Sequence, residues 1–182
     1  MTATLTVPRP VAGDHLPYYD TYINRVGEQE DVGTVLADLR RTTAALLASM
    51  SEAQASHRYA PGKWSVREVI AHVADSERVF AYRLLSIARG DATPLPGFDE
   101  NKWAEVSNAE SRPIADVAAE FAAVRDATLA LVRSLDAAGW ERKGTANGVG
   151  IAARSLPYII AGHERHHLAI LNDRYGVGPS EK

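Results

Sequence analysis

The stretch that decides the fold is Ala161–Leu171, AGHERHHLAIL, close to the end of the 182-residue chain. On a helical wheel at about 100° per residue, His163 and His167 each fall about 20° from the centre of the surrounding apolar stripe. Glu164 and His166 lie about 80° from that centre on opposite flanks, so we interpret both as edge residues without an assigned role. The pattern predicts a helix that directs two histidines, spaced i and i+4, into a protein core.

The helix that carries these histidines extends in both directions. It is predicted to run from about Ala152 to Tyr175, where Gly176 ends it. Pro157 lies near its beginning and either kinks the helix or moves its start to about Leu156.

Another helix is marked by its start signal. Ser65 and Glu68 form a capping box, because each side chain accepts a hydrogen bond from a backbone N–H group that the first turn leaves free. This helix is predicted to run to about Arg89, where Gly90 stops it.

Two more helices follow from apolar residues at helical spacing. One begins at Val32 and continues for about five turns. The other opens at Ser111 and Pro113 and ends at Gly139. Residues 143–150, KGTANGVG, are predicted to form a turn, and no segment alternates convincingly as a strand.

These helices make an all-α four-helix bundle the predicted fold class. The linker at residues 90–111 is long for a bundle connection, which favours a crossover between a second and a third helix that are not simple hairpin neighbours. We place the domain boundaries accordingly: an irregular, aromatic N-terminal arm at 1–30, a single bundle domain at 31–176 and a tail at 177–182.

Composition excludes several classes of site and partner. The chain has no cysteine, so disulfides, thiolate metal sites and cysteine nucleophiles are excluded, and any metal must bind to His, Asp or Glu. A formal net charge of -3 gives no electrostatic reason to expect nucleic acid or an anionic membrane as a partner. Since neither a signal-peptide pattern nor a run of about 18 apolar residues occurs, we expect a cytoplasmic protein.

The inward histidines point to a metal. Two imidazoles are costly to bury unless their ring nitrogens have partners, and a shared cation would satisfy one nitrogen on each of His163 and His167. The simpler alternative is a pair of hydrogen-bonded core histidines. His72, in VIAHVADSERVF, is the candidate third ligand from a strongly helical segment. It shares a polar strip with Ser76 and Arg83, which either lines a cavity or faces a neighbouring helix or subunit.

The segment from His163 to His167 also spells H-E-x-x-H, the zinc-binding pattern of metallopeptidases. In those enzymes the third ligand lies downstream of the motif. Here the 15 residues after His167 contain no histidine, and Glu181 is the one acid of plausible reach. A strand that could cradle a peptide substrate is also missing, so the sequence argues against a peptidase.

Three segments together resemble a known family: KWSVREVIAHVADSE at residues 63–77, SIARGDATPLPGFD at 86–99 and GHERHHLAIL at 162–171. They are similar to the DinB/YfiT-like superfamily of metal-dependent enzymes, and the resemblance covers most of the chain. It implies a four-helix bundle with one long crossover, often dimeric. It also implies a divalent metal held by His72, His163 and His167.

The resemblance further implies a reaction class. Characterised relatives join low-molecular-weight thiols such as bacillithiol to electrophiles, or isomerise maleylpyruvate with mycothiol. The chain departs from the HHRGQ sequence that is common in the superfamily, since it reads HHLAI from His166. The hypothesis is a metal-dependent enzyme that acts on a small molecule, with S-transfer from a thiol co-substrate as the leading version and hydrolysis as the other.

The expected ion is zinc or nickel, with iron, manganese and copper as alternatives. We expect Arg83 to bind a substrate carboxylate and Ser76 to orient a ligand, with Tyr22 of the arm as a further pocket residue. One alternative is a non-catalytic bundle that binds a metal or ligand in a stress response, and another is an interaction module whose histidines only pack. A homodimer through the first and third helices fits all three hypotheses.

Overall fold

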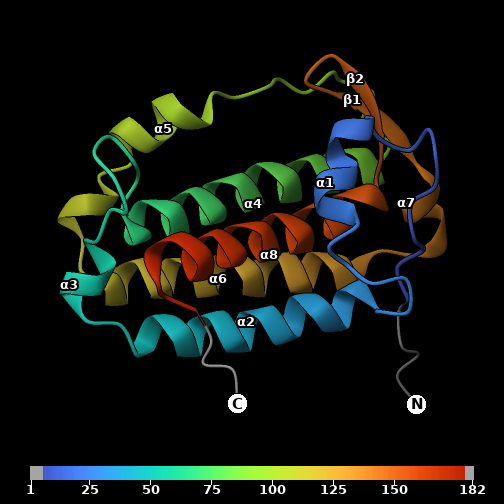
Figure 1. The fold of residues 1–182 in the computed structure, drawn as a ribbon. Coiled ribbons are helices and arrows are strands. Elements are labelled where there is room, and N and C mark those ends of the chain that lie inside the picture. Colours follow the sequence, from blue (N-terminus) through green and yellow to red (C-terminus); the bar gives the residue numbers. More distant parts are fainter. Residues whose placement is uncertain (1–5, 179–182) are drawn as a thin grey trace.

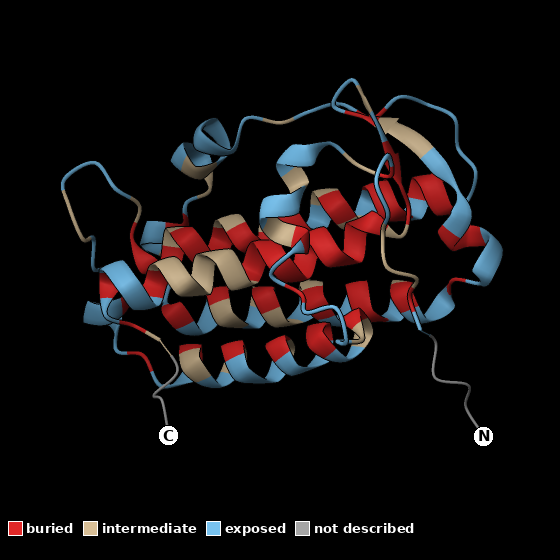
Figure 2. Cartoon of the chain, turned by 45° about the vertical axis from the view of Figure 1, so that its right-hand side comes forward, coloured by how far each residue is buried: buried red, intermediate tan, exposed pale blue. Residues whose placement is uncertain are grey.

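Four long helices build the molecule in the computed structural model, which describes residues 6–178. They are α2 (Val32–Ala48), α4 (Val66–Ala88), α6 (Ile114–Ser134) and α8 (Ser155–Tyr175). Helices α4 and α6 are neighbours that run in the same direction, while α2 and α8 run in the opposite direction (Figure 1). Buried residues line the inner faces of these helices (Figure 2). The predicted all-α four-helix bundle is confirmed.

The connection between α4 and α6 is the long crossover that the sequence predicts. Two parallel neighbours cannot be joined by a tight turn, so the chain must return along the bundle, which for the 23 residues of α4 is about 34 Å. Residues 89–113 make this return and contain α5 (Glu100–Val106) and the short 3₁₀ helix η2 (Ala109–Ser111). In Figure 1 this segment passes above the bundle from one end to the other.

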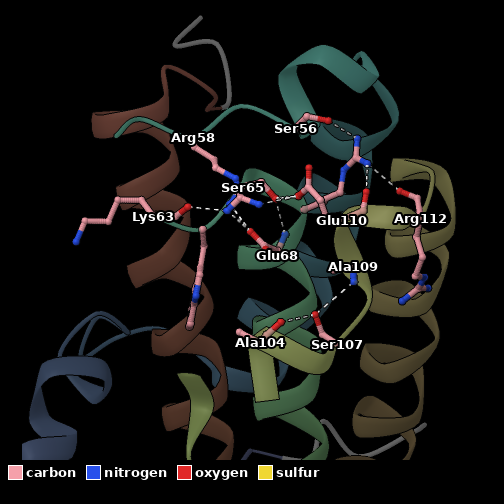
Figure 3. A network of polar contacts seen from close by, with 12 residues as sticks. Ser56, Arg58, Lys63, Ser65, Glu68, Ala104, Ser107, Ala109, Glu110 and Arg112 are labelled. Atoms are coloured by element: carbon pink, nitrogen blue, oxygen red, sulfur yellow. Dashed lines mark hydrogen bonds and ion pairs between the residues drawn. The ribbon is translucent and has the colours of Figure 1, made fainter. Parts of the chain in front are cut away.

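A polar network fastens the end of the crossover to the start of α4 (Figure 3). Ser65 and Glu68 form the predicted capping box. Arg58 donates to Glu68 Oε2 at 2.6 Å and to Glu110 Oε2 at 3.1 Å. Ser65 Oγ donates to the same Glu110 oxygen at 2.7 Å. The first turns of α4, which lead to His72, are therefore fixed against both the preceding loop and the crossover.

The predicted turn at residues 143–150 is a β-hairpin instead. Strands β1 (Lys143–Ala146) and β2 (Val149–Ala152) pair antiparallel, so the expectation of no strands is wrong. The connecting residues, Asn147 and Gly148, have φ angles of 53° and 76°. Positive φ at both positions is what a type I′ hairpin turn requires, and an Asn-Gly dipeptide is its usual sequence signal.

The hairpin also moves the start of α8. Because Ala152 ends β2, the helix begins at Ser155 and not at Ala152 as predicted. Pro157 then falls in the first turn, where its missing N–H removes no helical hydrogen bond. The observed start lies close to the alternative that the sequence left open at Leu156.

Helix α6 ends at Ser134, whereas the sequence predicted an end at Gly139. The reason is Asp136, whose side chain accepts a hydrogen bond from the Gly139 N–H at 2.8 Å and caps a separate short helix, α7 (Ala137–Glu141). A further short helix, α3 (Glu52–Ala55), lies between α2 and α4.

The N-terminal arm lies across α8. It contains the 3₁₀ helix η1 (Pro17–Tyr19) and the single-turn helix α1 (Asp20–Ile23). The backbone of Tyr22 passes so close to α8 that a Cβ atom at Gly162 would overlap the Tyr22 carbonyl oxygen. Glycine at this position therefore sets how closely the arm packs on the last helix.

The ends of the predicted arm (1–30) and tail (177–182) are residues 1–5 and 179–182, which lie outside the described residues together with Glu181. The domain boundaries themselves stay predictions. Within the described range, no helix combines the length and the apolar character needed to span a bilayer.

Candidate metal centre

Three histidine side chains, which we call the histidine cluster, meet inside the bundle. His163 and His167 come from successive turns of α8, and His72 comes from α4. The Nε2 atom of His163 lies 3.2 Å from that of His72 and 3.1 Å from that of His167. One ring nitrogen of each residue lies within 4.8 Å of the others, so the structure brings all three predicted ligands together.

The donor atoms fit a divalent cation better than they fit one another. Nitrogen atoms bound to one zinc at about 2.1 Å in a tetrahedral site lie about 3.4 Å apart, which is close to the observed spacings. The Nε2 atom of His163 faces two other Nε2 atoms and can form a hydrogen bond of good geometry with only one of them. A cation would accept a lone pair from every ring.

Burial keeps these imidazoles neutral. Loss of hydration lowers the pKa of His72 to about 4, although Glu100 opposes the shift. It lowers the pKa of His163 to about 3 and that of His167 to about 2, with added repulsion from the neighbouring imidazoles. Since neutral imidazole is the form that binds metals, the three rings need lose no proton to bind one at neutral pH.

Aromatic rings cover the histidine cluster from two sides. The ring centre of Trp64 lies 4.9 Å from that of His72, and the ring of Tyr22 stands edge-on to His163 at 5.3 Å. Tyr22 reaches this position because the arm packs directly on Gly162, one residue before His163. The arm and the loop before α4 thus shield the cluster.

The histidine cluster lines a cavity of about 390 Å³, a volume that suits a small molecule. The three predicted pocket residues, Tyr22, Ser76 and Arg83, line the same cavity. Ser76 and Arg83 are both buried, and Ser76 Oγ has no hydrogen-bond partner among residues 6–178. Of the two alternatives for the polar strip of α4, the structure supports the one in which it lines a cavity.

Sequence reasoning missed the cavity residues that come from the crossover and the hairpin. Glu100 of α5 and Asn147 of the hairpin both line the cavity. Backbone hydrogen bonds of 2.9 Å, from Leu95 N to Thr145 O and from Asn147 N to Leu95 O, hold the two segments together. No local pattern in either segment encodes this pairing, because it joins residues about fifty positions apart in the sequence.

Glu164, predicted to be an edge residue, is buried with 2% of its surface exposed. Its carboxylate accepts hydrogen bonds from Arg125 Nη2 and from Thr43 Oγ1, both at 2.6 Å. Arg125 also donates to both carboxylate oxygens of Glu77 at 2.8 Å. The wheel prediction is wrong because it equates burial with apolar character, whereas a charge can be buried when it is paired.

Thr43, Glu77, Arg125 and Glu164, which we call the arginine cluster, come from α2, α4, α6 and α8, one from each long helix. Burial acts to lower the pKa of Arg125, but Glu164 and Glu77 outweigh it and raise the pKa above its ordinary value. Burial raises the pKa of Glu164 against the opposing effect of Arg125. Because Glu164 is held in this cluster, it does not act as the base that an H-E-x-x-H peptidase places beside its metal.

The other two residues of the HERHH segment face the arm. Arg165 donates to the Arg25 carbonyl oxygen at 2.6 Å and pairs with Glu30 at 2.7 Å, which fastens the arm to α8. His166, the other predicted edge residue, is half-buried and lines the cavity beside Tyr22, with ring centres 5.6 Å apart.

Comparison with known proteins places the chain in a family. The sequence model of the DinB superfamily matches residues 36–171, a range that includes all three residues of the histidine cluster. The chain belongs to the DinB superfamily.

Three relatives of this DinB superfamily member are each named "putative metal-dependent hydrolase". One, from Oceanobacillus iheyensis, is 26% identical over 156 residues, which are 85% of this chain and 79% of the relative. A second protein of that organism is 31% identical over 137 residues, 74% of this chain and 78% of the relative. The third, from Geobacillus thermodenitrificans, is 29% identical over 150 residues, 77% of this chain and 82% of the relative.

The fold of the DinB superfamily member matches that of YfiT from Bacillus subtilis, with a TM-score of 0.64 at 21% sequence identity. The match covers 93% of this chain and 94% of YfiT, which is described as "a probable metal-dependent hydrolase with an unusual four-helix bundle topology". This likeness concerns the fold, and it confirms the DinB/YfiT-like bundle that the sequence predicts.

Proposed function

We propose that the chain is a metal-dependent hydrolase of a small molecule, with one divalent cation held by His72, His163 and His167. The observation that carries this proposal is the convergence of three histidine ring nitrogens within 4.8 Å at the wall of a cavity. The names of the relatives support the reaction class. Three protein ligands leave a coordination position for water or substrate, which is typical of catalytic metal sites.

When bound, the cation would polarise the substrate or lower the pKa of water. In hydrolysis the oxygen of water forms a bond to the electrophilic atom, the bond to the leaving group breaks, and a proton passes to the leaving group. Glu100 is the one carboxylate among the described residues that line the cavity, so we propose that its Oε atoms take the proton from water. Tyr22 and Trp64 restrict the access of bulk water to the histidines.

Metal content is the first test. Protein purified without chelator should contain near one metal ion per chain by inductively coupled plasma mass spectrometry, and zinc and nickel are the first ions to add if it does not. We expect His72→Ala and His167→Ala to lose the metal, and the exposed His57→Ala to keep it as the matched control. Wild-type protein that binds none of the tested ions after dialysis contradicts the proposal.

Activity is the second test. Metal-loaded protein is assayed against panels of small carboxylic esters, amides and phosphate esters, together with Glu100→Gln. We expect hydrolysis that requires the metal and falls in Glu100→Gln while the metal content stays unchanged. Bound metal without turnover of any substrate class favours the non-catalytic metal-binding bundle instead.

Thiol S-transfer is the second candidate, and the position of Glu164 favours it. A thiol with an ordinary pKa of about 8.5 needs less help from a protein base than water does, and Glu164 is held in the arginine cluster. The chain has no cysteine, so the thiol would be a co-substrate. Its sulfur would bond to the electrophilic carbon of the second substrate, whose leaving group departs, while the thiol proton passes to solvent.

S-transfer is tested with bacillithiol, mycothiol or cysteine and a haloalkane electrophile. Loss of free thiol and release of halide should proceed in equal amounts and should require the metal. Halide release without thiol loss identifies hydrolysis of the haloalkane, and neither signal with any thiol contradicts the transferase version.

We also keep as proposals a homodimer, a cytoplasmic location and the absence of nucleic-acid partners. Large hydrophobic residues that are exposed in the described chain include Tyr82 and Leu85 on α4 and Trp103 and Val106 on α5, and none lies on α2 or α6. Pairing through α2 and α6 therefore lacks an obvious apolar surface. Light scattering coupled to size-exclusion chromatography measures whether the chain pairs at all.

A further inference from the structure

Arg83 is a buried cation without an acidic partner in the part of the chain that the structure describes. It lies on α4 with 3% of its surface exposed. Its Nη2 donates to the Pro96 carbonyl oxygen at 2.8 Å, and its guanidinium carbon lies 5.6 Å from the ring centre of Phe80. Its Nε has no hydrogen-bond partner, and it forms no ion pair with any residue between 6 and 178.

The other buried arginines have the carboxylate partners that Arg83 lacks in the described structure. Arg125 is held by two carboxylates, and Arg67 pairs with Glu52 Oε2 at 2.7 Å. Burial lowers the pKa of Arg83, whereas the carboxylates around Arg125 raise the pKa of that residue. A guanidinium that stays charged inside a protein is costly unless an anion balances it. At Arg83 that anion does not come from the described part of the chain.

Arg83 lines the cavity that contains the histidine cluster. It follows His72 by eleven residues on α4, which is about three helical turns, so both residues lie on the same face roughly 16 Å apart along the axis. Ser76 lies between them, and its buried Oγ also lacks a partner in the described structure. One face of the cavity therefore presents, in addition to the histidines, two polar atoms without a hydrogen-bond partner in the described residues: Ser76 Oγ and Arg83 Nε.

We propose that the Arg83 end of the cavity binds the carboxylate of the substrate, with Ser76 as a second hydrogen-bond donor. A single guanidinium favours a monoanion, and a planar carboxylate matches its paired N–H groups. The substrate is then a small carboxylic acid whose reacting bond lies several covalent bonds from the carboxylate, near the histidines. The position of the reacting bond rests on the proposed function, whereas the anion site rests on Arg83 and Ser76 alone.

Metal-free protein isolates this site from any binding of carboxylates to a cation. We would titrate it with benzoate and with benzamide, its neutral match, by isothermal titration calorimetry. Wild-type protein should bind benzoate at least about tenfold more tightly than benzamide, and Arg83→Gln should remove that preference. Arg83→Lys keeps the charge but loses the paired geometry, so it should retain part of the preference.

The exposed Arg89→Gln, on the residue that caps the same helix, is the matched control and should leave the preference unchanged. Equal affinity for the two ligands in the wild type overturns the proposal, and so does a preference that persists in Arg83→Gln. If Arg83→Gln fails to fold, a preference of Arg83→Lys equal to that of Arg89→Gln overturns it. The metal content of the same variants is measured separately, so a wild type without metal refutes the proposed function and leaves the carboxylate result standing.

Discussion

The histidine cluster and the arginine cluster begin on neighbouring residues, yet they differ in how their polar atoms are satisfied. On α8, His163 enters the first cluster and Glu164 enters the second. The carboxylates and the guanidinium of the arginine cluster hold one another through bonds of 2.6 to 2.8 Å. The histidine cluster brings one ring nitrogen of each histidine within 4.8 Å of the others and borders a cavity.

The same core therefore contains two kinds of buried polar cluster, one that stabilises the packing of the helices and one that is free to bind a ligand. A closed cluster that joins all four helices fixes how they pack, and its groups are unavailable to a ligand. An open cluster is costly to bury until a ligand completes it, so its presence in the core is better explained by binding than by stability.

The largest effect is expected from Arg125→Met. It leaves Glu77 and Glu164 buried without a cation, and we expect the free energy of unfolding to fall by about 3–5 kcal/mol. The matching change in the open cluster, His163→Leu in metal-free protein, removes an imidazole without a good partner and should cost less than about 1 kcal/mol. Urea denaturation followed by circular dichroism measures both.

A further test uses the three charged residues of the arginine cluster. Replacing Arg125, Glu77 and Glu164 together by apolar residues of similar volume should recover most of the stability lost in Arg125→Met. If His163→Leu destabilises the metal-free protein as much as Arg125→Met does, the two clusters are not different in kind and the contrast fails.

The second effect is metal-dependent stability. At a free ion concentration of about 100 times the dissociation constant, binding should stabilise the wild type by about 2.7 kcal/mol and raise its melting temperature by about 5–10 °C. His167→Gln should lose this shift, whereas His57→Gln, on an exposed loop, should keep it. Thermal unfolding with and without zinc or nickel measures the shift, and an equal shift in wild type and His167→Gln would place the ion elsewhere.

These contrasts also explain how much the sequence could predict. Residues with strong local signals were predictable, such as the capping box at Ser65 and the inward spacing of His163 and His167. The crossover was predictable from its length. The capping box and the histidine spacing depend on interactions within one helix, and the crossover depends on the length of a connection. A sequence shows both kinds of information directly.

The arginine cluster could not be predicted in the same way. Arg125 and Glu77 are 48 positions apart, and nothing within either helix shows that the two charges pair with each other. Their burial depends on a partner from another helix, and the hydrophobic pattern of a single helix does not show which residue that partner is. The hairpin differs, because Asn147-Gly148 is a local signal that the prediction of a plain turn did not use.

The third effect concerns the arm that covers the open cluster. In Gly162→Ala the new Cβ would overlap the Tyr22 carbonyl oxygen, so the arm must move away from α8, at a cost of about 2 kcal/mol. Gly150→Ala is the control, because a Cβ atom there meets nothing within 4 Å. We expect faster limited proteolysis after Arg25 in Gly162→Ala and unchanged metal content. Proteolysis at the wild-type rate would mean that the arm does not depend on this contact.

The smallest effect concerns Asp14, which attaches the arm to the body of the protein. It forms a second closed cluster with Lys143 and Arg154. Its carboxylate is buried and pairs with Lys143 at 2.8 Å and with Arg154 at 2.7 Å. Burial acts to raise the pKa of Asp14, but these two cations outweigh it and hold the pKa well below its ordinary value. Asp14→Asn should therefore cost about 1 kcal/mol at pH 7, and Asp38→Asn, at an exposed surface pair, should cost little.

The pH dependence of the stability lost in Asp14→Asn shows whether Asp14 stabilises the arm through its charge or through packing. A depressed pKa in the folded state contributes stability that is present above the unfolded pKa of about 3.9 and is lost as pH falls towards the folded value. The difference in unfolding free energy between wild type and Asp14→Asn should thus be constant from pH 7 to about 5 and shrink below about pH 4. Urea denaturation at pH 7, 5 and 3.5 measures it. If the difference in unfolding free energy is the same at pH 3.5 as at pH 7, Asp14 holds the arm by shape and neutral hydrogen bonds. The cluster around Asp14 would then not depend on charge, in contrast to the arginine cluster.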